Sequence, residues 1–244
     1  MAGTARLPGR ELVGNHMKVT YYGQSCLAVE VGGTTLLFDP FIRPNPLAKA
    51  VDVEAIRTDY ILITHGHADH IADAVDIAKR TGATVIANYE VGEWLEKQGV
   101  PEGKIHLMNH GGAFGFPFGR VKSVNAIHSS TLPDGTPGGN PSGFVVETAH
   151  GNFYHAGDTA LTYDMKLVGD ATRLQWAALP IGDNFTMGVD DAIRAADFIK
   201  CSRVLGIHYD TFPPIRINHE EARRKFAAAE TELVLMGIGE TLDL

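Results

Sequence analysis

The sequence has little cysteine, no long apolar run and no excess of basic residues. Its two cysteines, Cys26 and Cys201, are far apart in 244 residues, which fits a reduced cytoplasmic setting better than a disulfide framework. No apolar run approaches the ~20 residues of a membrane-spanning helix. With 21 Lys and Arg against 29 Asp and Glu, the net charge of −8 lacks the basic excess of nucleic-acid binders. We therefore expect a cytoplasmic protein that binds neither membranes nor nucleic acid.

The remaining composition is that of a globular protein, with 44% hydrophobic and 20% charged residues. Residues 1–16 show no clear hydrophobic period and none of the features of a secretory signal. A strand-like pattern starts directly after Met17. We predict that residues 1–16 are a tag or a disordered extension, that His16 plays no part in the chemistry, and that residues 17–244 form one domain.

The pattern of apolar residues along this domain predicts an α/β fold. Helical spacing followed by a stop residue predicts a helix over 71–80, and similar spacing predicts others over 91–98, 190–200 and 220–230. Because strands dominate the start of each half, two sheets packed face to face with helices outside are the simplest arrangement. The predicted strands are 18–23, 26–31, 34–39, 60–63, 84–87, 144–147, 152–155, 174–180, 204–207 and 233–236.

The strongest chemical signal is a run of three histidines and one aspartate between residues 65 and 70, in the pattern H-x-H-x-D-H. It follows an apolar strand and precedes a helix, so it lies at the carboxyl end of the strand, where active sites of α/β sheets are common. His65 and His67 are two residues apart and can share one face, whereas Asp69 and His70 open the helix and can point elsewhere. Imidazole and carboxylate ligands pointing in two directions suggest two metal ions.

Three further residues of ligand type follow apolar strands. His128 comes after 121–127, Asp158 after 152–157, and His208 after 204–207. Asp158 would also suit a helix N-cap, and the two histidines could be strand-end residues with satisfied hydrogen bonds. Their shared position after strands favours metal binding.

These motifs resemble those of the metallo-β-lactamase superfamily. Among its members, the chain is similar to the UPF0173-type metal-dependent hydrolases related to the ascorbate-phosphate lactonase. The resemblance implies a four-layer αββα sandwich with two metal ions in a cleft at one edge of the sheets. It implies that His65, His67 and His128 bind the first metal, that Asp69, His70 and His208 bind the second, and that Asp158 bridges them. The segments that carry the resemblance are Thr64–His70, His128–Ser130, Gly157–Thr159, Pro180–Gly188 and Ile207–Phe212.

One position departs from the pattern of these proteins. Where they usually read Gly-His-Ser, this chain reads Gly23-Gln24-Ser25, and glutamine can still donate and accept hydrogen bonds. We predict substrate contacts for Gln24, Asn184 and Thr186. His155 is close to Asp158 in sequence and could hold a ligand by a hydrogen bond. The histidines without matching partners, expected to be structural or exposed, are His106, His110, His150, His155 and His219.

The function that follows is hydrolysis of a small ester-like substrate, a lactone or a phosphodiester, by a hydroxide held between two metal ions. Asp69, which orients the nucleophile, and Asp158, which bridges the metals, are the predicted catalytic residues. We expect zinc or manganese, and iron also suits these ligands. The relatives leave homo-oligomer formation open.

Other functions remain as alternatives. A nuclease of the same fold would act on phosphodiesters in nucleic acids, but the acidic balance disfavours it. A non-catalytic metal-binding module would keep the fold, but all the ligand positions are filled. A di-iron oxidoreductase would carry glutamate at the position of His67.

Overall fold

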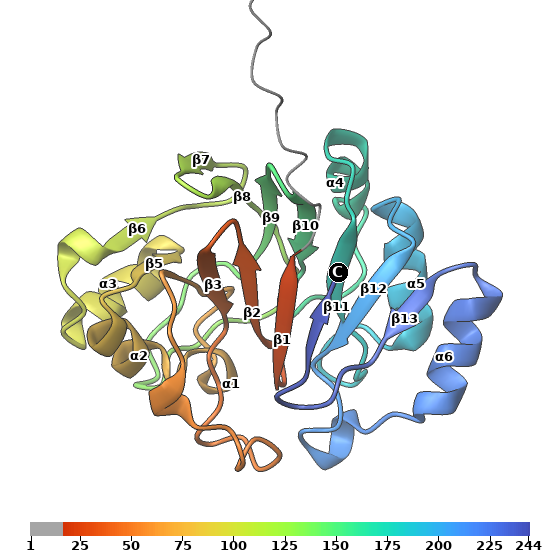
Figure 1. Ribbon diagram of the computed structural model, residues 1–244, viewed down its shortest axis with the longest axis horizontal. Coiled ribbons are helices and arrows are strands. Elements are labelled where there is room, and N and C mark those ends of the chain that lie inside the picture. The colour runs from red at the N-terminus through yellow and green to blue at the C-terminus, as the bar shows by residue number, and fades with distance from the viewer. Residues whose placement is uncertain (1–16) are drawn as a thin grey trace, which may run out of the picture.

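Residues 17–244 of this computed structural model form two seven-stranded sheets that pack face to face (Figure 1). The predicted tag or extension, residues 1–16, lies outside the described residues. The first sheet has the order β14-β1-β2-β3-β4-β5-β6, and the second has the order β13-β12-β11-β10-β9-β8-β7. The strands of the first sheet are β1 (Lys18–Gly23), β2 (Cys26–Val31), β3 (Thr34–Phe38), β4 (Tyr60–Leu62), β5 (Thr84–Ala87), β6 (Ile105–Leu107) and β14 (Thr241–Asp243).

The second sheet repeats the plan of the first. In each, an antiparallel meander leads into strands that run parallel: β3 to β6 in the first sheet and β10 to β13 in the second. Parallel strands end at the same edge of their sheet, so the loops that follow them gather there. The strands are β7 (Ala113–Phe116), β8 (Gly119–Asn125), β9 (Ser142–Thr148), β10 (Gly151–His155), β11 (Trp176–Pro180), β12 (Arg203–Ile207) and β13 (Glu232–Val234).

Both faces of the central strands are buried, because one faces the other sheet and one faces helices. Along β3, Leu36 and Phe38 join the apolar cluster shared with the second sheet, whereas Leu37 packs with the helices of the first half. In β4, Leu62 and Ile61 divide between the same two clusters. The alternation follows the two-residue period of a strand, and it explains why these strands read as continuous apolar runs.

Helices cover the outer face of each sheet and complete the predicted four-layer αββα sandwich, which is confirmed. The first sheet carries α1 (Ala68–Ile71), α2 (Ala74–Thr81) and α3 (Tyr89–Lys97). On the second are α4 (Met165–Ala171), α5 (Val189–Phe198) and α6 (His219–Ala228). No helix within residues 17–244 is long and apolar enough to cross a lipid bilayer.

The helix predicted over 71–80 is wrong in one respect, because two helices, α1 and α2, occupy this region. The chain breaks at Asp73, whose backbone N–H donates to the carbonyl of Pro40 at 3.0 Å instead of continuing the helix. The Asp73 carboxylate accepts from the backbone N–H groups of Ile42 and Arg43. The break therefore ties the helical segment to the loop after β3.

Strand β14 brings the two ends of the described chain together. It pairs antiparallel with β1, and Leu244 donates its backbone N–H to the carbonyl of Met17 at 3.0 Å. The sheet of the first half is thus completed by residues that lie more than two hundred positions away in sequence.

Candidate metal centre

The seven predicted ligands meet at one edge of the two sheets. His65 follows β4, His128 follows β8, Asp158 follows β10 and His208 follows β12. Asp69 and His70 open α1. The structure sorts their ligand atoms into two groups, each within 4.8 Å: the first is His65, His67 and His128, and the second is Asp69, His70, Asp158 and His208.

Asp158 lies between the two groups. Its Oδ2 atom is 2.9 Å from His208 Nε2 and 3.3 Å from His70 Nε2, both in its own group. The same oxygen is 3.6 Å from Nε2 of His128, which belongs to the other group. A carboxylate in this position can contact both groups at once.

The second group is strongly charged. Burial acts to lower the pKa of His70, but the carboxylates of Asp158 and Asp69 outweigh it and raise that pKa well above its usual value. Burial likewise acts to lower the pKa of His208, but the carboxylate of Asp158 outweighs it, and the pKa of His208 rises to about 9. In turn, burial acts to raise the pKa of Asp158, yet His70 and His208 hold it well below its usual value. Two anionic carboxylates thus attract positive charge to this point.

The first group is a set of neutral nitrogen donors. Burial, together with the neighbouring His70, lowers the pKa of His65 well below its usual value. Burial is also the main cause of the lowered pKa values of His67 and His128. His65 Nε2 and His67 Nδ1 are only 2.9 Å apart. Neutral imidazole is the form that binds a metal ion.

Unpartnered atoms show that these residues suit metal ions. Within residues 17–244, His70 Nε2 and Asp158 Oδ1, which belong to the second group, are buried and have no hydrogen-bond partner. Such atoms are costly in a protein interior unless something binds them. The donor set of imidazole nitrogens and carboxylate oxygens fits a divalent transition metal.

Asp39 contacts His70 of the second group on the side of the ring away from the other ligands. The sequence analysis missed this residue. It follows β3, it is fully buried, and its Oδ2 atom lies 2.9 Å from His70 Nδ1. It also accepts hydrogen bonds from the backbone N–H and the hydroxyl of Thr64. A carboxylate on Nδ1 fixes the histidine so that Nε2 faces the centre. Its position directly after an apolar strand was a signal, since His128, Asp158 and His208 share it.

Two glycines allow the backbone to approach closely near the ligands. Gly157, which precedes Asp158, has φ +63°, and a Cβ there would lie 2.9 Å from both the Ser142 carbonyl oxygen and Thr64 Cβ. At Gly182, a Cβ would lie 2.1 Å from the carbonyl oxygen of His208. Larger residues at these positions would displace the loops that carry Asp158 and His208.

His155 contacts the backbone next to Asp158 and not a candidate ligand itself, which differs from the hydrogen bond to a ligand that the sequence suggested. It is buried, its Nε2 lies 3.0 Å from the Ser25 carbonyl oxygen, and its Nδ1 accepts from the backbone N–H of Gly157 at 3.2 Å. Because the carbonyl can only accept, Nε2 must carry the proton. His155 therefore fixes the turn before Asp158.

The predicted substrate-contacting residues lie in different places. Gln24 is buried behind Asp69, and its amide Nε2 donates to Asp69 Oδ2 at 2.8 Å. Asn184 lines a neighbouring pocket, and Thr186 donates to the Met187 carbonyl. None of the three lines the cavity of about 590 Å³ in front of the ligands, which we call the metal cleft. Their contact with substrate stays a prediction.

His106, His110, His150 and His219 lie outside both groups. His219 Nε2 pairs with Asp210 at 2.6 Å, and His110 Nε2 contacts the Pro141 carbonyl oxygen at 2.7 Å. His106 packs against Phe114 and Phe116.

Replacing Gln24 with alanine tests its hold on Asp69. We expect Gln24→Ala to weaken metal binding about tenfold, because the carboxylate loses the donor that orients it. A chelator competition titration measures the effect. Gln24→His, which installs the histidine that the family resemblance implies at this position, should behave like the original chain. Unchanged metal affinity in Gln24→Ala would show that Asp69 does not need this hydrogen bond.

The comparisons with known proteins agree with this fold and donor set. Residues 34–209 match the model of the β-lactamase superfamily domain. The chain is 54% identical over 228 residues to a UPF0173 metal-dependent hydrolase of Flavobacterium johnsoniae, a match covering 93% of this chain and all of the relative. It is 51% identical over 228 residues to one from Methylacidiphilum infernorum.

A solved structure extends the agreement to three dimensions. Igni18, a metallo hydrolase from the archaeon Ignicoccus hospitalis, superimposes with a TM-score of 0.84 at 34% identity, covering 94% of this chain and 98% of Igni18. The chain is therefore a metal-dependent hydrolase of the metallo-β-lactamase superfamily. Within that superfamily it belongs to the UPF0173 family. The predicted similarity to the ascorbate-phosphate lactonase stays a prediction.

Proposed function

We propose that the chain hydrolyses a small ester-like molecule, a lactone or a phosphodiester, with two divalent metal ions, zinc or manganese. His65, His67 and His128 would hold one ion, Asp69, His70 and His208 would hold the other, and Asp158 would bridge them. The observation that carries the proposal is the position of Asp158 Oδ2, 2.9 Å from His208 Nε2 and 3.6 Å from His128 Nε2. One carboxylate oxygen in reach of both sets is what a shared ligand requires.

The chemistry divides between the ions and the chain. When bound, the ions supply positive charge that lowers the pKa of water and polarises the oxygen of the scissile group. Asp69 faces the metal cleft with its side chain 26% exposed, and His70 and His208 outweigh burial to keep its pKa below the usual value. An ionised Asp69 can accept a hydrogen bond from the attacking water and so orient it.

The reaction balances with water alone. The water oxygen forms a bond to the carbonyl carbon or the phosphorus, and the bond from that atom to the leaving oxygen breaks. One proton of the water is transferred to the leaving oxygen, which becomes an alcohol or, when a lactone opens, a hydroxyl group of the same molecule. The other proton stays with the water oxygen in the acid product and is released to solvent when that acid ionises. Gln24 holds Asp69 through this sequence by its 2.8 Å hydrogen bond.

Metal stoichiometry and turnover together test the proposal. The full chain would be stripped with a chelator, reloaded with zinc or manganese, and assayed on a lactone, a carboxylic ester and a phosphodiester. We expect two ions for each chain, turnover of at least one substrate, and loss of that turnover on stripping. Saturation at one ion, or turnover that persists in the stripped protein, would contradict the proposal. Two bound ions without any turnover would favour a non-catalytic metal-binding module.

A further inference from the structure

The walls of the metal cleft are apolar. Apart from the candidate ligands and Ser129, the residues that line it are Phe41, Ala68, Phe185, Phe212 and Pro214. Among its described lining residues there is no lysine or arginine. Its volume of about 590 Å³ is within the range of small-molecule pockets. Any part of a substrate that extends beyond the metal ions would therefore contact apolar side chains.

The three phenylalanines come from three separate loops that are each held in place. Phe41 follows β3 and is 6% exposed, and its ring lies 6.3 Å from that of Phe212. Phe212 precedes two prolines in a short 3-10 turn, Pro213–Ile215, which restricts its backbone to an extended form. These two rings together form one wall of the metal cleft, and both are fixed by their surroundings.

Phe185 stands at the tip of the third loop. It is 55% exposed, although the loop is closed at its base by a β-bridge between Gly182 and Gly188. The backbone N–H of Asp183 donates to the Met187 carbonyl at 3.0 Å. An ordered loop thus holds a large apolar side chain partly in water at the side of the metal cleft.

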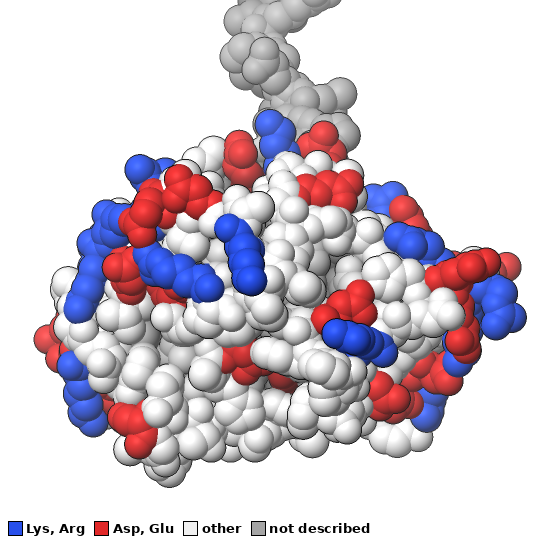
Figure 2. Space-filling view, turned by 90° about the horizontal axis from the view of Figure 1, so that it is seen from below, with Lys and Arg blue, Asp and Glu red and all other residues white. Residues whose placement is uncertain are grey.

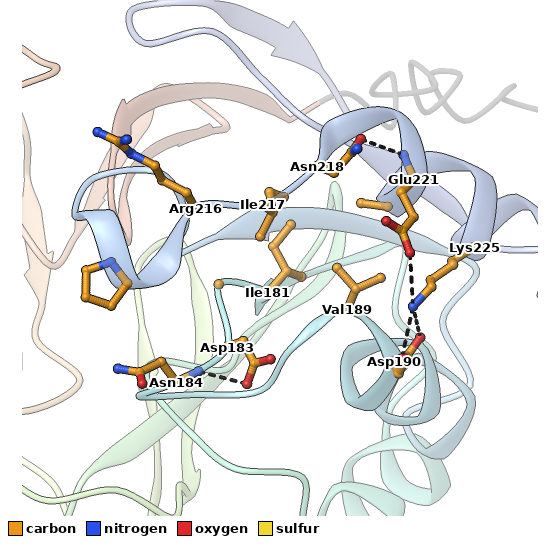
Figure 3. Close-up of a pocket in the computed structure, with 13 residues that line it drawn as sticks. Ile181, Asp183, Asn184, Val189, Asp190, Arg216, Ile217, Asn218, Glu221 and Lys225 are labelled. Atoms are coloured by element: carbon orange, nitrogen blue, oxygen red, sulfur yellow. Dashed lines mark hydrogen bonds and ion pairs between the residues drawn. The ribbon is translucent and has the colours of Figure 1, made fainter.

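Two basic residues near the cleft, Lys225 and Arg216, line a separate pocket that shares only Pro214 with the metal cleft (Figure 3). There Lys225 pairs with Asp190 at 2.9 Å and approaches Glu221 at 3.6 Å. Arg216 points away from Lys225 and Asp190 in that view. The face seen from below in Figure 2 has a broad area without charged side chains in its lower middle. No lysine or arginine is among the described residues that line the cleft, so neither can pair with an anionic substituent there.

We infer that the substrate is a carboxylic ester or lactone whose uncharged alkyl or aryl group lies against Phe41, Phe185 and Phe212. The inference rests on the proposed function and narrows its substrate class, because a phosphorylated or other charged substituent would lose its hydration against these walls without gaining a partner. An apolar group gains by leaving water, in proportion to the area it buries.

A series of esters with one leaving group measures the effect. The metal-loaded full chain would be assayed on p-nitrophenyl acetate, butyrate and hexanoate, and we expect kcat/KM to rise about tenfold with each step. Phe185→Ser should reduce the step to about twofold, and Phe185→Leu should restore most of it. Phe114→Ser is the matched control, because Phe114 is 50% exposed on β7, outside the metal cleft. A flat series, or faster turnover of a phosphorylated lactone than of the hexanoate, would overturn the inference.

A binding measurement separates this inference from the proposed function. The probe is 2-octanone, an uncharged molecule that cannot be hydrolysed. Saturation-transfer NMR on the metal-free chain measures its binding to the apolar walls without any contribution from metal ions or turnover. We expect binding by the original chain and by Phe114→Ser, and at least a fivefold loss in Phe185→Ser. If no ester is turned over but 2-octanone binds in this pattern, the apolar site stands and the proposed hydrolysis fails. If acetate is turned over and 2-octanone does not bind, the hydrolysis stands and this inference fails.

Discussion

Asp158→Asn should abolish hydrolysis and leave the fold in place. We expect kcat/KM to fall at least about a thousandfold, equivalent to about 4 kcal/mol of transition-state stabilisation. The amide keeps the shape of the side chain but loses the negative charge that lies 2.9 Å from His208 and 3.3 Å from His70. The proposed bridging ligand and the attraction for positive charge are then lost together.

The measurement pairs metal content with turnover. Metal analysis after reloading should find fewer than two ions for each chain in Asp158→Asn, and circular dichroism should show the original secondary structure. Asp73→Asn is the matched control because Asp73 is also 2% exposed but lies outside both ligand groups, so it should keep both ions. A fully loaded and fully active Asp158→Asn would show that this residue is not a shared ligand.

Asp39→Asn should weaken metal binding without removing any candidate ligand. Asp39 accepts three hydrogen bonds, from the backbone and hydroxyl of Thr64 and from His70 Nδ1. An asparagine cannot accept all of them, because one of its two polar groups is a donor. We expect metal affinity to fall ten- to a hundredfold, as for other groups that orient a ligand, and unfolding free energy to fall by about 2 kcal/mol.

Asp73→Asn again provides the comparison, since it separates positioning from stability. Asp73 accepts from the backbone N–H groups of Ile42 and Arg43 and pairs with the Arg43 guanidinium at 3.0 Å. Its replacement should lower the unfolding free energy by a similar amount, measured by denaturant titration, and leave the affinity for zinc unchanged. Equal losses of zinc affinity in the two variants would mean that Asp39 acts only through general stability.

The sequence was most informative where one local pattern carries several ligands. The residues from His65 to His70 lie in one strand-to-helix turn. Their spacing alone predicted that the ligand side chains point in two directions, toward two metal ions. His128, Asp158 and His208 were found because each follows an apolar strand. Strands that run in the same direction end at one edge of a sheet, whatever their separation in sequence; β10 and β12 do so in the parallel part, and β8 does so as the next strand but one from β10 in the antiparallel part. The strand-rich start of each half predicted two sheets packed face to face with helices outside, and the resemblance implied the same sandwich, whereas strand patterns do not fix the order of strands within a sheet.

Features that depend on distant contacts could not be predicted in this way. Phe41, Phe185 and Phe212 have no common spacing, and only the folded loops bring them to one cavity. The helix break at Asp73 arises from its bond to Pro40, which helical spacing does not reveal. Helix α4 has only seven residues, and β14 has only three, so neither is long enough to show a clear period.

The pairing of β14 with β1 has a consequence for the order in which the chain assembles during translation. The outer edge of β1 is an early product of the ribosome, yet its partner, Thr241–Asp243, is synthesised much later. The cluster of ligands is likewise incomplete until His208 has left the exit tunnel, and the backbone N–H of His208 then binds the carbonyl of Gln24 at 2.8 Å. Completion of the second ligand group and closure of the first sheet are therefore late events, and a nascent chain carries an open strand edge that chaperones can protect.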